Sequence, residues 1–182
     1  MNLPHLFYIQ NLDIVVLEMI CLFLFWTTLM VVLKDRARRI VGVAAAVLSL
    51  TAILLMTVYK RSSDENAVIS LIPFISFVNA REQVEIYRSL LMNVCLFLPL
   101  GLSLPFALPQ KQKPKVMITL GCALFLSVAI EGIQLAFRLG HCETDDVIMN
   151  VLGALVGTLS YMIFGKIQGF KNKHRHRHIE RP

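Results

Sequence analysis

Polar side chains interrupt two apolar stretches in the second half of this chain, at spacings that place them on one face of a helix. In the first stretch, Glu131, Gln134 and Arg138 are separated by three and then four residues, which brings them to one helical face. In the next stretch, Asp146 and Asn150 are four residues apart. Charged groups at membrane depth are costly and usually face a partner, a cavity or a ligand. We therefore expect two polar stripes that face each other across a short loop.

These residue types are suited to two kinds of chemistry. Arg138 would contact a phosphate or carboxylate through two parallel N–H groups, with neighbouring amides as further donors. Alternatively, Glu131 with Asp145 or Asp146 would act as a general base or hold a divalent cation. The sequence contains neither an H-E-x-x-H motif nor a G-x-S-x-G elbow. We therefore favour binding over catalysis, and we expect no cofactor and no metal.

A purely structural role is the competing interpretation. Arg138 would then pair with Glu131, Asp145 or Asp146 to fasten the two helices, and Thr144 with the two aspartates would cap the second helix. Interhelical polar contacts in membranes contribute only about 0.6 kcal/mol on average. That is a small stabilisation for so many polar groups, so we favour a site for the residues further inside the helices.

The composition is that of a membrane protein that crosses the bilayer several times. Of the 182 residues, 56% are hydrophobic and only 16% are charged, against about 25% charged residues in ordinary soluble domains. We predict an all-α fold with about five transmembrane helices. Their predicted ranges are 14–33, 40–58, 90–108, 116–137 and 147–165. Five helices divide badly into repeats and no internal copy is found, which argues against a transporter.

The connections and the tail also carry signals. The apolar run 68–78 contains a proline and is too short to span a bilayer, so we expect an interfacial or re-entrant segment. Asn79 and Glu82 have the spacing of a capping box, which predicts a helix start. The tail 166–182 is polar and basic, and we expect it to be disordered. Its HRHRH run at 174–178 would bind a metal or, as we favour, anionic lipid.

The distribution of Lys and Arg predicts the topology. Thirteen of the 18 Lys and Arg residues fall in the connections 34–39 and 109–115 and in the tail, and five fall on the other side. Because cytoplasmic loops carry the excess of basic residues, we place the N-terminus outside and the C-terminus in the cytoplasm. The polar residues then converge at the outer face. The net charge of +6 is not gathered on a basic, aromatic-bearing face, so we expect no nucleic-acid partner.

Gly153 and Gly157 form a G-x-x-x-G motif on the same face as Asn150. Such a motif lets two helices approach closely. It would hold together either two copies of this chain, as a homo-oligomer, or two helices of one chain.

The order of the polar motifs along residues 70–165 resembles that of the VanZ-like family of bacterial membrane proteins. The motifs that carry the resemblance are Leu71-Ile72-Pro73-Phe74, Asn93 with Leu96-Phe97-Leu98-Pro99-Leu100-Gly101, Glu131-x-x-Gln134, Arg138, Asp145-Asp146 and Asn150-x-x-Gly153. Residues 1–69 would then contribute two N-terminal helices and the start of the outer loop, and residues 166–182 a cytoplasmic tail.

The resemblance implies a multi-pass protein of the bacterial plasma membrane. The founding member of the family lowers susceptibility to teicoplanin, a glycopeptide that acts on cell-wall precursors. An outer-face site for a lipid head group, a lipid-linked cell-wall precursor or a lipoglycopeptide would be formed by Asn93, Glu131, Gln134, Arg138, Asp145, Asp146 and Asn150. The alternative is an intramembrane enzyme that acts on an envelope lipid or precursor through Glu131, Asp145 and Asp146.

Overall fold

The protein is a bundle of long helices. The computed structural model describes residues 3–59, 69–70, 72–74, 84–109, 114–139 and 142–179. Within these ranges the helices are α1 (Leu3–Val32), α2 (Asp35–Leu54) with the π-helical turn η1 (Leu55–Tyr59), α4 (Val84–Ala107), α5 (Lys115–Ala136) and α6 (Thr144–Ile179). Two short strands, β1 (Ile69–Ser70) and β2 (Cys142–Glu143), pair in parallel. The predicted all-α fold is confirmed.

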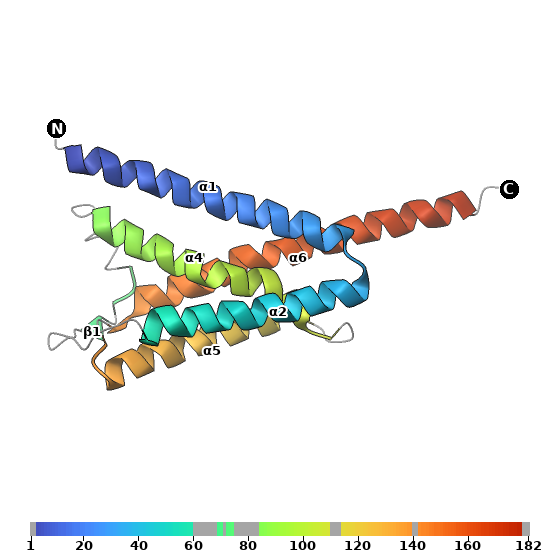
Figure 1. The fold of residues 1–182 in the computed structure, drawn as a ribbon. Coiled ribbons are helices and arrows are strands. Elements are labelled where there is room, and N and C mark those ends of the chain that lie inside the picture. Colours follow the sequence, from blue (N-terminus) through green and yellow to red (C-terminus); the bar gives the residue numbers. More distant parts are fainter. Residues whose placement is uncertain are drawn as a thin grey trace.

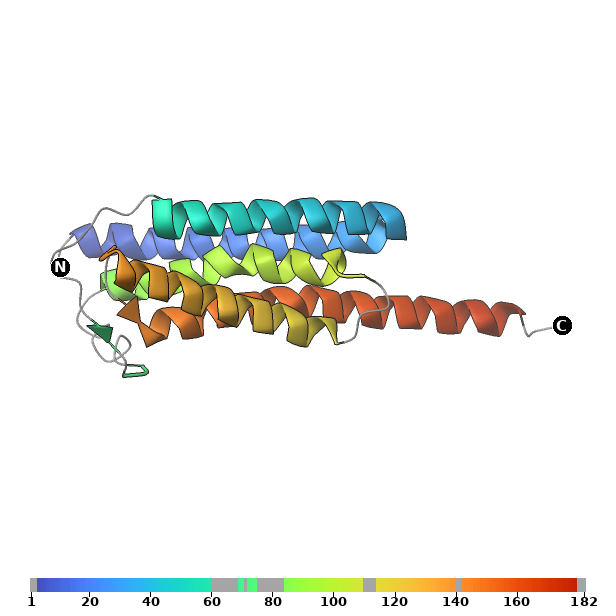
Figure 2. The same cartoon turned by 90° about the horizontal axis from the view of Figure 1, so that it is seen from below.

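Each helix contains a stretch that is long and apolar enough to cross a membrane. By length and composition these stretches are Asp13–Val32, Asp35–Tyr59, Ile86–Ala107, Lys115–Ala136 and Thr144–Lys171. They confirm the five predicted spans. The helices run side by side along one axis, and the two ends of the chain lie at opposite ends of the bundle (Figures 1 and 2).

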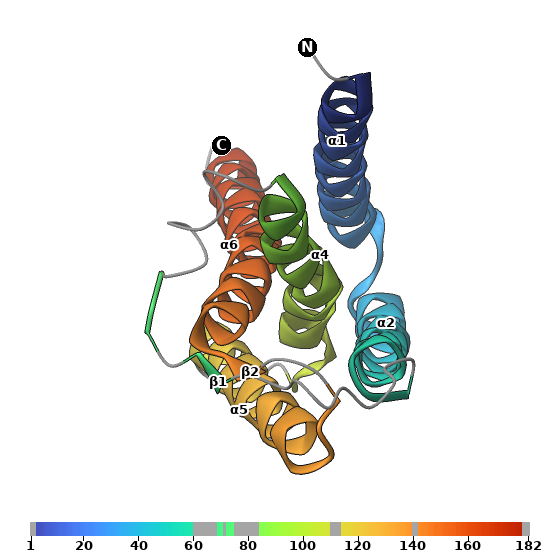
Figure 3. The same ribbon diagram turned by 90° about the vertical axis from the view of Figure 1, so that its left-hand side faces the viewer.

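Helix α4 occupies the middle of the bundle. Seen along the axis, it lies between α6 and α2, with α1 on one side and α5 on the other (Figure 3), and it contacts all four. Apolar side chains fill the spaces around it in two clusters. One cluster is built on Ile53, Phe97, Leu100, Ala123, Ile130 and Ala154, and the other on Trp26, Met30, Leu98, Leu102 and Phe106.

Helices α4 and α6 approach so closely that their contact requires glycine on both sides. A Cβ on Gly101 would overlap the backbone of Ala154, and a Cβ on Gly153 would overlap the backbone of Val94. Gly157, one turn further along α6, meets the backbone of α4 in the same way. Of the two arrangements that the sequence left open, the G-x-x-x-G motif therefore adopts packing within one chain. These glycines thus face α4 of the same chain, and a homo-oligomer of the chain stays a prediction.

Helix α6 extends beyond the membrane span that was predicted for it. It continues to Ile179, so the prediction that the tail is disordered from residue 166 is wrong. Lys, Arg and Gln are good helix formers, and adding residues to an existing helix avoids the cost of starting a new one. The predicted helix start at Asn79 and Glu82, and most of the apolar run 68–78, lie outside the described residues.

Candidate functional site

The predicted site residues lie toward the end of the bundle that carries β1 and β2. At this end η1 and α5 finish and α4 and α6 begin (Figures 1 and 3). Segments far apart in the sequence therefore meet here. The pairing of Ile69 with Cys142 and of Ser70 with Glu143 joins the region before α4 to the start of α6.

The two acids in the first turn of α6 fasten other segments to it. Asp145 is 1% exposed, and its Oδ1 accepts a hydrogen bond from the backbone N–H of Phe74 at 2.5 Å. Phe74 has a φ of 65°, a left-handed conformation that residues other than glycine adopt rarely, so this bond helps to hold it. The Oδ1 of Asp146 accepts a hydrogen bond from Nδ2 of Asn93 at 2.5 Å. The first turn of α6 is thus tied both to the segment before α4 and to α4 itself.

Glu131 fastens the connection between α5 and α6. It is 6% exposed, and its Oε2 accepts a hydrogen bond from the backbone N–H of Glu143 in β2 at 3.1 Å. Beside it, the hydroxyl of Thr144 donates to the carbonyl of Ser70 in β1 at 3.5 Å. Together these contacts close the end of the bundle around the start of α6.

Two buried amides, one in α6 and one near the end of α5, face different partners. Asn150 donates from Nδ2 to Oγ of Ser127 at 2.9 Å, which joins α6 to α5. Gln134 donates from Nε2 to the carbonyl of Thr57 at 3.0 Å, which joins α5 to η1. The side-chain oxygens of both amides are buried without a hydrogen-bond partner among the described residues. Such orphaned acceptors are rare in folded proteins and require an explanation.

Arg138 differs from the other predicted site residues because it is exposed. It lies in the turn after α5 with a φ of 52°. Within the part of the chain that the structure describes, its guanidinium makes no hydrogen bond or ion pair, so the pairing with Glu131, Asp145 or Asp146 that the structural interpretation requires is not found there.

The structure brings some of the seven predicted residues into contact and separates others. The side chains of Asn93 and Asp146 are hydrogen-bonded to each other, whereas Gln134 bonds to η1 and Glu131 bonds to β2. Sequence reasoning named Phe74 only as part of a family motif and did not name Thr57, because each contributes a backbone group that no residue type reveals. Among the described side chains, no group of three or more His, Cys, Asp or Glu residues is placed to hold a metal ion.

Apolar spanning helices with buried polar contacts near one end define a helical membrane protein that crosses the membrane several times. The family model of VanZ/LLP1 matches residues 40–165, more than half of the chain. This chain belongs to that family, as its motifs predicted. The match begins in α2, so this helix is part of the family pattern although the sequence offered no mark there.

A curated relative is similar to the chain over part of its length. Protein VanZ of Enterococcus faecium is 32% identical over 107 residues, which are 58% of this chain and 55% of the relative. The match therefore spans about half of the relative. No solved structure matches this chain significantly.

Proposed function

We propose that this protein is a VanZ-like protein of the bacterial plasma membrane that lowers susceptibility to glycopeptide and lipoglycopeptide antibiotics such as teicoplanin. Membership of the VanZ/LLP1 family and the similarity to Protein VanZ support this proposal. The site would be the polar end of the bundle, and the ligand a lipid-linked cell-wall precursor or the glycopeptide itself.

The observation that carries the proposed site is the contrast between Arg138 and the three acids near it in the sequence. Asp145, Asp146 and Glu131 each accept a hydrogen bond from within the chain. The guanidinium of Arg138 is exposed, and among the described residues it has no partner. Arginine presents a planar fork of donors that matches phosphate and carboxylate. We assign the acids to holding the site together and Arg138 to contacting the ligand.

The orphaned amide oxygens are hydrogen-bond acceptors that the proposed site offers in addition to Arg138. The oxygens of Asn150 and Gln134 are acceptors without a partner among the described residues. Lipid-linked wall precursors and glycopeptides both carry sugars and peptides, which are rich in hydroxyl and amide donors. An acceptor that gains such a donor no longer bears the cost of burial without a hydrogen bond. This feature favours a sugar- or peptide-bearing ligand over a simple phospholipid.

The proposed orientation makes this site accessible to such ligands. With the N-terminus outside, the end of the bundle that carries β1 and β2 faces the outside of the cell, where glycopeptides act. The excess of basic residues at the opposite end supports this orientation. The enzyme alternative has weaker support, because the three carboxylates that it requires already have structural tasks.

The test uses a teicoplanin-susceptible bacterial host that expresses the wild type or Arg138→Gln. We expect the wild type to raise the minimal inhibitory concentration and the variant to lose this effect. Loss of a charge-assisted hydrogen bond weakens ligand binding by about tenfold or more. Arg138→Lys should also protect poorly, because lysine keeps the charge but lacks the fork.

Arg88→Gln is the matched control, since Arg88 is an exposed arginine in α4 near the same end. Membrane abundance is measured by blot for each protein. Protection by Arg138→Gln equal to that of the wild type would remove Arg138 from the site. A wild type that changes no susceptibility would overturn the proposed function. Turnover of a lipid-linked precursor by purified protein, abolished in Glu131→Gln, would establish the enzyme alternative instead.

A further inference from the structure

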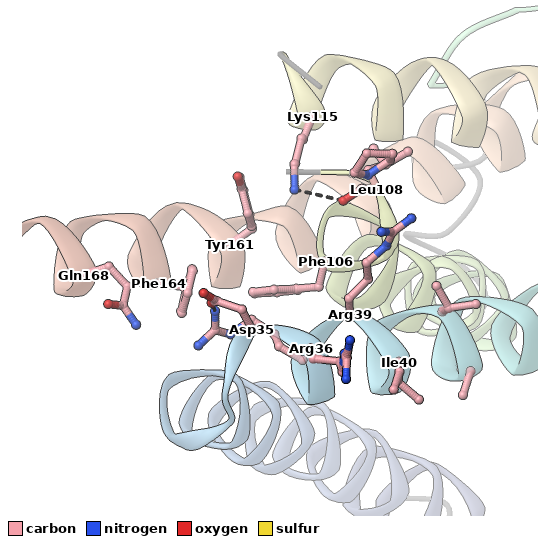
Figure 4. A pocket seen from close by; sticks show the side chains of 14 residues that line it. Asp35, Arg36, Arg39, Ile40, Phe106, Leu108, Lys115, Tyr161, Phe164 and Gln168 are labelled. Atoms are coloured by element: carbon pink, nitrogen blue, oxygen red, sulfur yellow. Dashed lines mark hydrogen bonds and ion pairs between the residues drawn. The ribbon is translucent and has the colours of Figure 1, made fainter. Parts of the chain in front are cut away.

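A large cavity lies at the end of the bundle opposite the polar site. Its volume is about 1210 Å³. It is bounded by the first turns of α2 and α5, the end of α4 and the part of α6 around Tyr161 to Gln168 (Figure 4). The family motifs and the proposed function use none of these lining residues.

Asp35, an acidic residue that lines this cavity, is already paired with a basic residue of the same lining. Arg38 forms an ion pair with Asp35. It also donates to the carbonyls of Met30 and Leu33, and its guanidinium lies 4.3 Å from the centre of the Phe164 ring. These contacts fix the turn between α1 and α2. They leave Arg38 little capacity for a ligand.

Three further cations line the cavity, and among the described residues no acid pairs with them. Arg36 and Arg39 are exposed, and within the described residues their side chains have no hydrogen bond or ion pair. Lys115 is buried, donates from Nζ to the carbonyl of Leu108 at 3.0 Å and lies 5.4 Å from the centre of the Tyr161 ring. Figure 4 shows Arg39 and Lys115 both extending toward Leu108 at the end of α4. The described side chains therefore give this part of the cavity a positive charge.

Two helix N-termini add to this field. Helices α2 and α5 begin at the cavity, and neither N-cap residue, Lys34 or Pro114, makes a side-chain capping hydrogen bond. Uncapped N–H groups and the helix dipole both favour an anion at such a position. The basic side chains and the two helix N-termini therefore both favour a negatively charged ligand.

Most of the remaining lining is apolar, and part of it is exposed at the surface of the bundle. Phe106 and Phe164 form part of the wall, and Ile40 and Val43 on α2 are 63% and 44% exposed. The candidate spans in α2 and α5 start at Asp35 and Lys115, so the cations lie at the level where helices enter the membrane. A small inorganic anion would leave most of the volume unfilled, since typical pockets for drug-sized ligands are only about 300–1,000 Å³.

We propose that this cavity is a binding site for an anionic phospholipid. Arg36, Arg39 and Lys115 hold its phosphate, and its acyl chains lie along the apolar wall and α2. Basic pockets between transmembrane helices recognise lipid head groups in this manner. The inference does not depend on the proposed function, since it concerns the other end of the molecule.

The single tryptophan of the chain provides the measurement. Trp26 is 8% exposed, and its ring centre is 6.4 Å from that of Phe106, which lines the cavity. A brominated lipid in the cavity should quench its fluorescence. The full-length protein is placed in nanodiscs, and brominated phosphatidylglycerol is compared with brominated phosphatidylcholine. We expect a preference for phosphatidylglycerol, and we expect Arg36→Gln with Arg39→Gln to reduce it by about fivefold for each arginine.

Lys166→Gln with Lys171→Gln removes the same charge from exposed positions of α6 at this end that do not line the cavity. This control should keep the preference for phosphatidylglycerol. An equal loss in the control would mean that only the general surface charge attracts lipid. A wild type without preference, or arginine variants that retain it, would also overturn the proposal. Displacement of the brominated lipid by millimolar inorganic phosphate would assign the cavity to a free anion instead. Circular dichroism verifies that every variant is folded.

Discussion

At the residue scale, Asp145 shows how a buried carboxylate can be explained without a ligand. It occupies the first turn of α6, where negative charge interacts favourably with the helix dipole. Its Oδ1 also accepts the N–H of Phe74, a residue 71 positions earlier in the chain. One side chain therefore stabilises a helix end and anchors a distant segment. Arg138 has no comparable task among the described residues, which is why the two belong to different parts of the proposed site.

This assignment predicts that Asp145→Ala destabilises the fold. The N–H of Phe74 would lose its acceptor and α6 would lose a favourable charge, so the free energy of unfolding should fall by about 1–2 kcal/mol. Thermal unfolding in detergent, followed by circular dichroism, measures the effect. Asp13→Ala is the control, because Asp13 is exposed near the start of the first span. Equal unfolding temperatures for the two variants would show that the Asp145 contact contributes nothing.

At the scale of elements, the contact between α4 and α6 holds the site together. Asn93 and Asp146 project from these two helices and are bonded to each other. Gly101 and Gly153 set the distance between the helices. At both glycines the backbones of α4 and α6 touch directly, so no side chain can move to change the distance between the two helices. The distance between the polar side chains of Asn93 and Asp146 therefore depends on glycines in the apolar interior.

Gly101→Ala should therefore destabilise the bundle, whereas Gly121→Ala should not. The added methyl at residue 101 would overlap the backbone of Ala154, and such overpacking costs about 1–3 kcal/mol. A methyl at residue 121 of α5 has nothing within 4 Å, and replacing glycine by alanine in a helix stabilises it by up to about 1 kcal/mol. Detergent-solubilised protein is titrated with denaturant for both variants. A loss at residue 121 as large as that at residue 101 would refute the close-packing argument.

The sequence predicted the helices well because apolar length and local periodicity determine them. It predicted less well which helices the polar residues would join. Glu131 and Gln134 share a stripe, but one contacts β2 and the other contacts η1, since neighbouring positions on a helix can face different partners. The lipid cavity was not predicted at all. In the sequence, Arg39 and Lys115 indicated only the topology, and nothing there shows that two positions 76 residues apart meet around the end of α4.

At the scale of the whole molecule, the two ends of the bundle differ in chemistry. One end carries buried and half-buried acids that accept hydrogen bonds from backbone N–H groups and from the amide of Asn93. The other end carries a cavity with unbalanced cations. The start of α1 and the end of α6 lie at opposite ends of the bundle (Figure 1). The orientation of the chain therefore decides which of these two ends meets the outside of the cell.

The excess of basic residues predicts that the cavity end, with the C-terminus, is cytoplasmic. Green fluorescent protein fused after Pro182 should fluoresce, and alkaline phosphatase at the same position should be inactive. The same two proteins are also fused to the N-terminus through a linker that does not itself direct export. There we expect no fluorescence and an active phosphatase. An active C-terminal phosphatase would place the polar end in the cytoplasm, beyond the reach of an external glycopeptide. That result would overturn the proposed function, yet the lipid proposal would stand, because anionic lipid is present in both leaflets and the quenching experiment is independent of orientation.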